Sequence, residues 1–127
     1  LKEKAYKTAI ISSGPRHAAL RAQKECGLDY IHTHDLAIGE DNKFTGYYEW
    51  DLGGHDKTER LALFVKEAGC TMQETVFVGH DHNDTSSLKA AGLGVAVNPE
   101  DDDVAQAADI VIDDIKELLS VIEDSQP

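Results

Sequence analysis

The chain has 127 residues, 41% of them hydrophobic, which is typical of one globular domain with a buried core. With 24 acidic and 12 basic side chains, its formal charge is -12. This excess of negative charge disfavours nucleic acid and anionic membrane surfaces as partners of the chain as a whole. The sequence has no apolar run of membrane-spanning length and no signal-peptide pattern, and its two cysteines lack framework spacing. We therefore expect a cytoplasmic protein.

The first half of the chain contains two short apolar runs and a helical segment. Residues 8–11 predict a buried strand, and the next segment predicts a helix that begins at Pro15 and is capped by Gly27. Residues 28–33 predict a second strand. Between residues 36 and 52, aromatic residues flank a polar turn, which predicts a β-hairpin beside the main sheet.

The second half alternates strands with helices after a break at Gly53-Gly54. The predicted elements are a helix over residues 57–68, a strand over 75–78, a helix over 83–91, a strand over 93–97, a short helix after Pro99, a strand over 110–112 and a helix over 115–122. Such alternation is typical of a parallel sheet with right-handed crossovers. We predict one α/β domain over residues 1–127, with a Rossmann-like parallel sheet flanked by helices.

The most informative segment is residues 76–84, with the sequence Val-Phe-Val-Gly-His-Asp-His-Asn-Asp. A short apolar strand ends in Gly79, and two carboxylates, an amide and two imidazoles follow within five positions. Open α/β sheets bind ligands beyond the carboxyl ends of their strands. Asp81 and Asp84 are therefore candidates to hold a divalent cation through oxygen ligands. The alternative is a solvated acidic turn that only caps the next helix.

Two further polar groups lie at a strand end and at a helix start. Ser12, followed by Ser13 and Gly14, offers a hydroxyl and backbone N–H groups to an anion at a helix N-terminus. The alternative is an N-cap serine, the commoner use of serine at such a junction. Lys57 begins a predicted helix, where a cation opposes the helix dipole, and a charge kept at an unfavourable place hints at function. The alternative is an ordinary exposed lysine.

Two His-x-His pairs suggest a different kind of metal site. They are His32 with His34, and His80 with His82. Side chains two positions apart on a strand share a face, so each pair can supply two ligands to a transition metal. The alternative is that both pairs are exposed polar residues in loops.

Together, these motifs resemble the haloacid dehalogenase (HAD) superfamily, and in particular its phosphoserine phosphatase branch. Residues 10–14 are similar to the second motif of that family, Lys57 to its third-motif lysine, and residues 78–84 to its fourth motif. The three motifs occur in the family's order, and the resemblance extends from Thr8 to about Leu119.

The resemblance implies a hydrolase that removes phosphate from a small phosphorylated metabolite with the help of Mg²⁺. The resemblance also implies which residues form the site, with one group for the phosphate and another for the metal. They are Ser12, Ser13, Gly14 and Lys57 for phosphate binding, with Ser12 and Lys57 also catalytic, and Asp81, Asp84 and the supporting Asn83 on the metal side.

The chain departs from the family pattern in two places. The family's nucleophile is an aspartate in an Asp-x-Asp motif on an N-terminal strand, and no predicted strand of this chain ends that way. Most of the cap domain is missing as well. His80 occupies the position of the metal-binding carboxylate, and imidazole suits a transition metal better than Mg²⁺. We therefore expect no turnover without an Asp-x-Asp motif.

The missing nucleophile strand would lie in the middle of the family's sheet, between the strands at residues 8–11 and 76–78. Its absence would leave unpaired backbone groups on both strands. Either these strands pair with each other, or a strand comes from a missing N-terminal segment or from a second copy in a homodimer. We expect the sequence to be incomplete. The competing hypothesis is a non-catalytic HAD-like binding or assembly module that keeps the phosphate pocket.

Overall fold

The structure, a computed structural model, describes residues 5–38, 40–49 and 57–125, and for residues 34–38 and 44–49 it describes the backbone only. The chain divides into two compact units, Leu1–Arg60 and Leu61–Pro127, and each unit is described by itself. The break predicted at Gly53-Gly54 lies outside the described residues. The prediction of a single domain over residues 1–127 stays a prediction.

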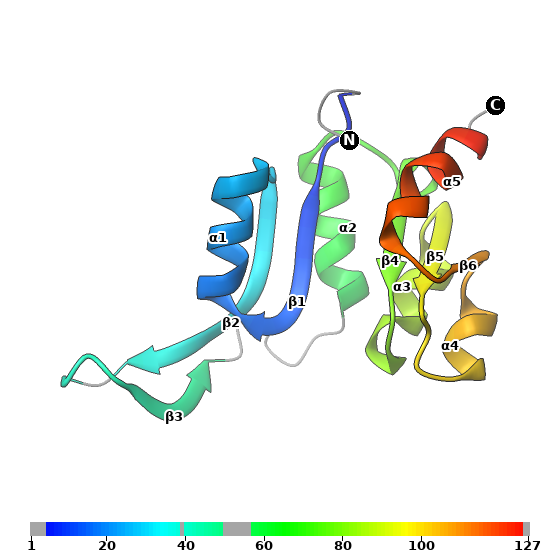
Figure 1. Cartoon of the computed structure of the whole chain (residues 1–127). Helices are drawn as coiled ribbons and strands as arrows, with labels where there is room; N and C mark the ends of the chain where they lie inside the picture. Colours follow the sequence, from blue (N-terminus) through cyan, green and yellow to red (C-terminus); the bar gives the residue numbers. More distant parts are fainter. Residues whose placement is uncertain (1–4, 39, 50–56, 126–127) are drawn as a thin grey trace. The chain divides into compact units, whose positions relative to one another are not determined.

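The first unit is a three-stranded sheet with one helix packed along it (Figure 1). Its elements are β1 (Ala9–Pro15), α1 (Arg16–Cys26), β2 (Tyr30–Ile38) and β3 (Phe44–Glu49). The order in the sheet is β1-β2-β3, with β1 parallel to β2 and β2 antiparallel to β3. The antiparallel pair confirms the predicted hairpin, although its first strand is the continuation of β2.

Several boundaries in the first unit differ from the prediction, and β2 spans Tyr30–Ile38 where the sequence predicts a strand over residues 28–33. β1 extends to Pro15, because the segment after Ile11 stays extended and Pro15 still pairs with the backbone of His34. Pro15 is therefore the N-cap of α1, with φ -70° and ψ 139°, and the helix begins at Arg16. At the other end of α1, Gly27 adopts the left-handed conformation with φ 68°, as predicted for a helix cap.

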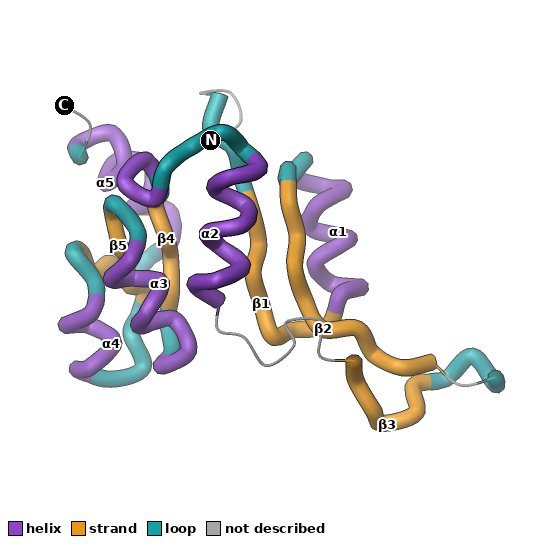
Figure 2. The backbone as a smooth tube through the Cα atoms, turned by 180° about the vertical axis from the view of Figure 1, so that it is seen from behind, coloured by secondary structure: helices purple, strands orange, loops and turns teal. Residues whose placement is uncertain are grey.

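The second unit is a sheet of three parallel strands with helices against it. The strands are β4 (Val76–Gly79), β5 (Leu93–Val97) and β6 (Ile110–Ile112), in the order β4-β5-β6. The helices are α3 (Thr85–Ala90), α4 (Asp102–Ala107) and α5 (Leu118–Asp124), with 3-10 turns η2 (Met72–Glu74), η3 (His82–Asp84) and η4 (Ile115–Glu117). Figure 2 shows α3 and α4 side by side on one face of this sheet.

One further helix, α2 (Lys57–Glu67), spans the boundary between the two units. Its buried side chains are Leu61, Phe64 and Val65, three of the four apolar residues that the sequence places on one face. Within the part of the chain that the structure describes, none of the helices is both long and apolar enough to cross a membrane.

The core of the second unit lies between its sheet and α3 and α4. Val95 of β5 and Val104 of α4 are fully buried, and Leu88 of α3 is 1% exposed. The α3 backbone lies directly on β5, because a Cβ atom on Gly94 would lie 2.2 Å from the carbonyl oxygen of Leu88. Because β4 and β5 are parallel neighbours, the loops at their carboxyl ends lie next to each other.

Each unit has its own sheet, in which β1 is the first strand of one and β4 the first strand of the other. Within these sheets, β1 pairs with β2 and β4 pairs with β5. Both arrangements considered from the sequence, direct pairing of β1 with β4 and a strand supplied from elsewhere, stay predictions.

We expect Leu88→Ala to lower the free energy of unfolding by about 2–5 kcal/mol, because it removes a buried side chain and leaves a cavity. Urea unfolding followed by circular dichroism measures this loss. The matched control is Leu63→Ala in α2, whose side chain is 55% exposed, and its expected change is within about 0.5 kcal/mol. Equal losses in the two variants would contradict the core described for the second unit.

Candidate functional site

The first candidate region is the carboxyl end of β1. Ser12 is half-buried there, and its Oγ accepts a hydrogen bond of 3.0 Å from the backbone N–H of Gly14. Ser12 is not an N-cap, because β1 continues past it and Pro15 takes that position without a side-chain cap. The hydroxyl of Ser12 therefore lies next to a backbone N–H at a strand end, and Ser13 between them is exposed.

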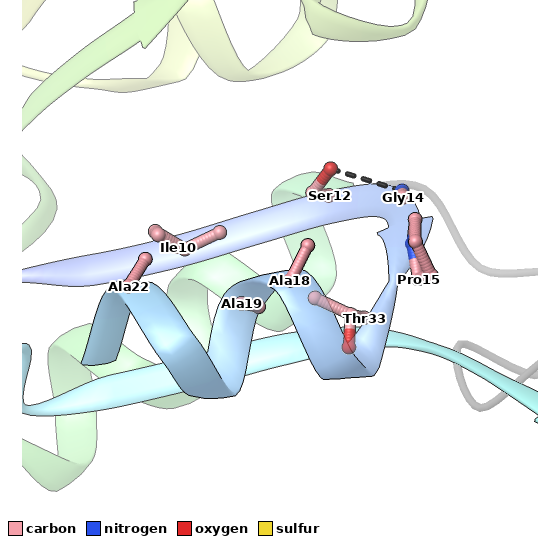
Figure 3. Close-up of a pocket in the computed structure, with 8 residues that line it drawn as sticks. All are labelled: Ile10, Ser12, Gly14, Pro15, Ala18, Ala19, Ala22 and Thr33. Carbon is pink, nitrogen blue, oxygen red and sulfur yellow. Dashed lines mark hydrogen bonds between the residues drawn. The ribbon is translucent and has the colours of Figure 1, made fainter. Parts of the chain in front are cut away.

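A pocket of about 230 Å³ lies beside Ser12 (Figure 3). Small apolar side chains of α1 form one wall, and β1 and β2 form the rest. The lining residues are Ile10, Ser12, Gly14, Pro15, Ala18, Ala19, Ala22 and Thr33. All of them belong to the first unit, so the pocket is a feature of that unit alone. In Figure 3 the Ser12 hydroxyl points toward Gly14 and away from the alanine side chains of α1, so the pocket adjoins residue Ser12 on the helix side of β1.

Lys57 is the first residue of α2, as the sequence predicts, and its side chain is partly exposed. The first turn of the helix also holds Glu59, whose charge favours that end of the helix dipole. The residues that connect β3 to Lys57 lie outside the described part of the chain. The phosphate-binding role of Lys57 stays a prediction.

The second candidate region is the turn after β4, residues 79–84, which the Asp84 carboxylate holds in shape. Its Oδ2 accepts hydrogen bonds from the backbone N–H groups of His80 at 2.8 Å and Asp81 at 3.2 Å. Asp81 in turn caps η3, with its Oδ1 accepting from the N–H of Asn83 at 3.0 Å. Both predicted metal carboxylates thus make hydrogen bonds within the turn. Asp84 is only 5% exposed, and together with Asp81 it caps η3, as the alternative of an acidic capping turn predicts.

Gly79 is required by the close approach of Asp84. A Cβ atom at position 79 would lie 2.6 Å from the Cβ of Asp84, closer than two carbon atoms can pack. Any other residue would displace the Asp84 carboxylate from the two N–H groups that it binds. The glycine before the polar cluster is therefore part of the same structural unit as Asp84.

His80 connects this turn to the loop after β5. Its Nδ1 lies 3.0 Å from the carbonyl oxygen of Val97, the last residue of β5. The backbone carbonyl of His80 also accepts a hydrogen bond of 2.9 Å from the N–H of Glu100. The bond to Val97 is the main reason that the pKa of His80 lies above its ordinary value of 6.5.

His82 makes a second connection, to the start of α4. Its Nε2 contacts the carboxylate of Asp101, which caps α4 by accepting from the N–H of Val104 at 3.1 Å. The bond from Val104, with a further contribution from His82, holds the pKa of Asp101 below its usual value. Nothing in the sequence marked Val97, Glu100 and Asp101 as partners of this turn, because Asn98-Pro99 indicates only a turn there.

The predicted Mg²⁺ site does not fit the turn as the structure describes it. Asp84 uses an oxygen for the turn itself, and the His80 ring bonds to Val97 and carries nitrogen, a poor ligand for Mg²⁺. Over the described ranges, no three His, Cys, Asp or Glu side chains form a group able to hold a metal ion. The metal roles of Asp81 and Asp84 stay predictions that this geometry does not support.

The transition-metal alternative gains no support either. The rings of His80 and His82 contact different partners, and no third ligand joins them within the described residues. His32 is buried in β2, and the side chain of His34 lies outside the described residues.

Comparisons with known proteins place this geometry in a wider group. A family described as haloacid dehalogenase-like hydrolase matches residues 4–123. The chain is 34% identical over 125 residues to a phosphoserine phosphatase of Methanocaldococcus jannaschii, which covers 96% of this chain and 58% of that protein. It is 45% identical over 81 residues to a pyridoxal phosphate phosphatase of Escherichia coli, which covers 64% of this chain and 30% of that protein.

The solved structures agree. A substrate-bound phosphoserine phosphatase matches with a TM-score of 0.86 and 32% identity, over 94% of this chain and 58% of that one. An apo form matches with a TM-score of 0.85. This similarity confirms the predicted Rossmann-like α/β fold. The chain spans about 58% of the length of the Methanocaldococcus jannaschii relative.

We expect the pKa of His80, measured by NMR titration of its ring protons, to lie above 6.5, because the protonated ring donates to the Val97 carbonyl. The raised pKa means that this contact stabilises the fold most below pH 6.5. The extra stabilisation that the charged ring supplies over the neutral one is lost as the pH rises through the folded-state pKa. The chain unfolded in urea supplies the reference titration. A folded-state pKa at or below that reference would contradict the contact.

Proposed function

The chain belongs to the haloacid dehalogenase-like hydrolase family, and on that premise we propose that it is the phosphate-binding core of a phosphatase. Its substrate would be a small phosphomonoester. The names of two relatives support this class of substrate, because one acts on phosphoserine and the other on pyridoxal phosphate. Residues 1–127 would form a single, incomplete core domain that requires an Asp-x-Asp strand for turnover.

The observation that carries the proposal is the contact between Ser12 and Gly14 beside the pocket. A hydroxyl that accepts from Gly14 still has its own hydrogen to donate to a phosphoryl oxygen. Hydrogen bonds to a charged acceptor are stronger than bonds between neutral groups. Ser12 would therefore bind the phosphoryl group, with the backbone N–H of Ser13 as a further donor. The N–H of Gly14 would join them only by exchanging its bond to Ser12 for one to the ligand.

Lys57 would supply the positive charge. Phosphoryl transfer places negative charge on the oxygens of the transferring group, and a positioned cation lowers the free energy of that state. A local cation is needed because the chain as a whole carries a formal charge of -12, which repels a phosphorylated ligand. Under this proposal, Ser12 and Lys57 are the catalytic residues that this chain contributes.

Turnover also needs a nucleophile, which in the family is the first aspartate of the Asp-x-Asp motif. None of the described strands β1 to β6 ends in that motif. β1 and β4 each begin a separate sheet, which suits a further strand that would carry the nucleophile. That strand would come from an N-terminal segment of a longer protein or from a second copy of the chain.

A second candidate function is a non-catalytic phosphate-binding module of the same family. The His80 ring favours this second function. His80 stands where the family has its metal-binding carboxylate, and here its ring bonds to the carbonyl of Val97. The two candidates share the phosphate site and differ in turnover. Only the phosphatase core would hydrolyse a phosphomonoester once an Asp-x-Asp strand is supplied.

We expect Ser12→Ala to weaken the binding of inorganic phosphate roughly tenfold or more, because it removes a hydrogen bond to a charged ligand. The dissociation constant comes from NMR titration of the amides of residues 12–14 in the 127-residue chain. The matched control is Ser120→Ala on exposed α5, for which we expect unchanged affinity. Equal affinity of Ser12→Ala and the unmodified chain would contradict the proposed site.

A further inference from the structure

The turn after β4 is joined to the loop after β5 by contacts that cross between the two loops. His80 contributes two of them, from its ring to the carbonyl of Val97 at 3.0 Å and from its carbonyl to the N–H of Glu100 at 2.9 Å. His82 contributes the third, through its contact with Asp101. Residues 79–84 and 97–101 are thus linked at three points by groups of the chain itself.

The ring of His80 is oriented by this linkage and not by burial, because the side chain is exposed. A backbone carbonyl can only accept a hydrogen bond, so the Nδ1 atom that faces Val97 must carry the hydrogen. In a neutral imidazole the hydrogen sits on one nitrogen only. The contact with Val97 therefore selects the Nδ1–H form of neutral His80.

The interior of the turn is held by hydrogen bonds as well. Asp84 accepts from the N–H groups of His80 and Asp81, and Gly79 leaves the space that this carboxylate needs. The backbone N–H of His80 is thus bonded inside the turn, while its carbonyl and ring are bonded to the neighbouring loop. His80 thus makes all three kinds of contact, through its N–H, its carbonyl and its ring.

We propose that His80 is a positioning residue that fastens the β4–α3 turn to the β5–α4 loop, so that the turn keeps its shape through hydrogen bonds without bound Mg²⁺. The inference rests on the proposed function, because family membership is what assigns this turn to the metal side of the site. His80 departs from the family pattern, in which this position holds a carboxylate that binds the metal. The ring of His80 instead binds the protein.

The first test is the tautomer of His80 in the ¹⁵N-labelled 127-residue chain, at a pH well above its pKa. Two-bond ¹H–¹⁵N correlation spectra distinguish the two neutral forms. The proposal requires the Nδ1–H form, because only that form donates to Val97. Observation of the Nε2–H form would overturn it. This readout needs no variant, so it stays decisive even if a substitution at position 80 prevents folding.

The second test combines a variant with Mg²⁺ as the probe. His80→Ala removes the bond from the ring to Val97 but keeps the backbone carbonyl that accepts from Glu100. Because the two loops would then separate more readily, amide hydrogen exchange at Glu100 should become roughly two- to tenfold faster, the range expected for the loss of the ring bond. The control His17→Ala replaces an exposed histidine of α1 and should leave this rate unchanged. Millimolar MgCl₂ should shift none of the amides of residues 79–84 in the unmodified chain.

Two results of the second test would overturn the proposal. One is an unchanged exchange rate at Glu100 in His80→Ala, and the other is a saturable shift of the turn amides with MgCl₂. Phosphate titration of residues 12–14 in the same samples tests the proposed function separately. Absence of phosphate binding would contradict that function and leave the His80 proposal standing. A shift of the turn amides with MgCl₂ would contradict the His80 proposal and leave the proposed function standing.

Discussion

The Asp84 carboxylate sets the course of the chain where it leaves β4, and the acidic side of the site depends on this interaction. It accepts from two successive backbone N–H groups, those of His80 and Asp81, and it lies against Gly79 with no space for a Cβ atom. This turn directs the His80 ring toward the Val97 carbonyl. Because two hydrogen bonds satisfy the buried Asp84 oxygen, its burial in the turn costs little.

The chemistry of the family requires phosphate-binding groups, a metal side and a nucleophile, and this chain carries them unequally. The first unit holds Ser12 beside a pocket of about 230 Å³, and Ser12 is the residue proposed to bind the phosphoryl group. The second unit holds the acidic turn, in which Asp81 and Asp84 bond to the chain's own backbone. The nucleophile motif is absent from the described strands. Phosphate binding is accordingly the part of the function that the chain supports best by itself.

The sequence predicts the fold well where apolar runs are bounded by turn residues. The strands at residues 93–97 and 110–112 are confirmed to the residue, because glycine, proline and acidic residues surround them. β1 is longer than predicted, since Ser-Ser-Gly-Pro is typical of a turn and the pairing that keeps it extended involves a distant strand. The bond from His80 to Val97 could not be predicted, because it depends on which strands are neighbours and on the shape of both loops.

The most direct test of the phosphatase assignment is hydrolysis of phosphoserine by this sequence extended with the Asp-x-Asp segment of the Methanocaldococcus jannaschii relative. The account predicts no turnover by the 127-residue chain, because it lacks the nucleophile. It predicts turnover by the extended protein and its loss in the extended Ser12→Ala variant. An extended protein that folds, binds phosphate and hydrolyses nothing would contradict the assignment, as would turnover that Ser12→Ala leaves unchanged.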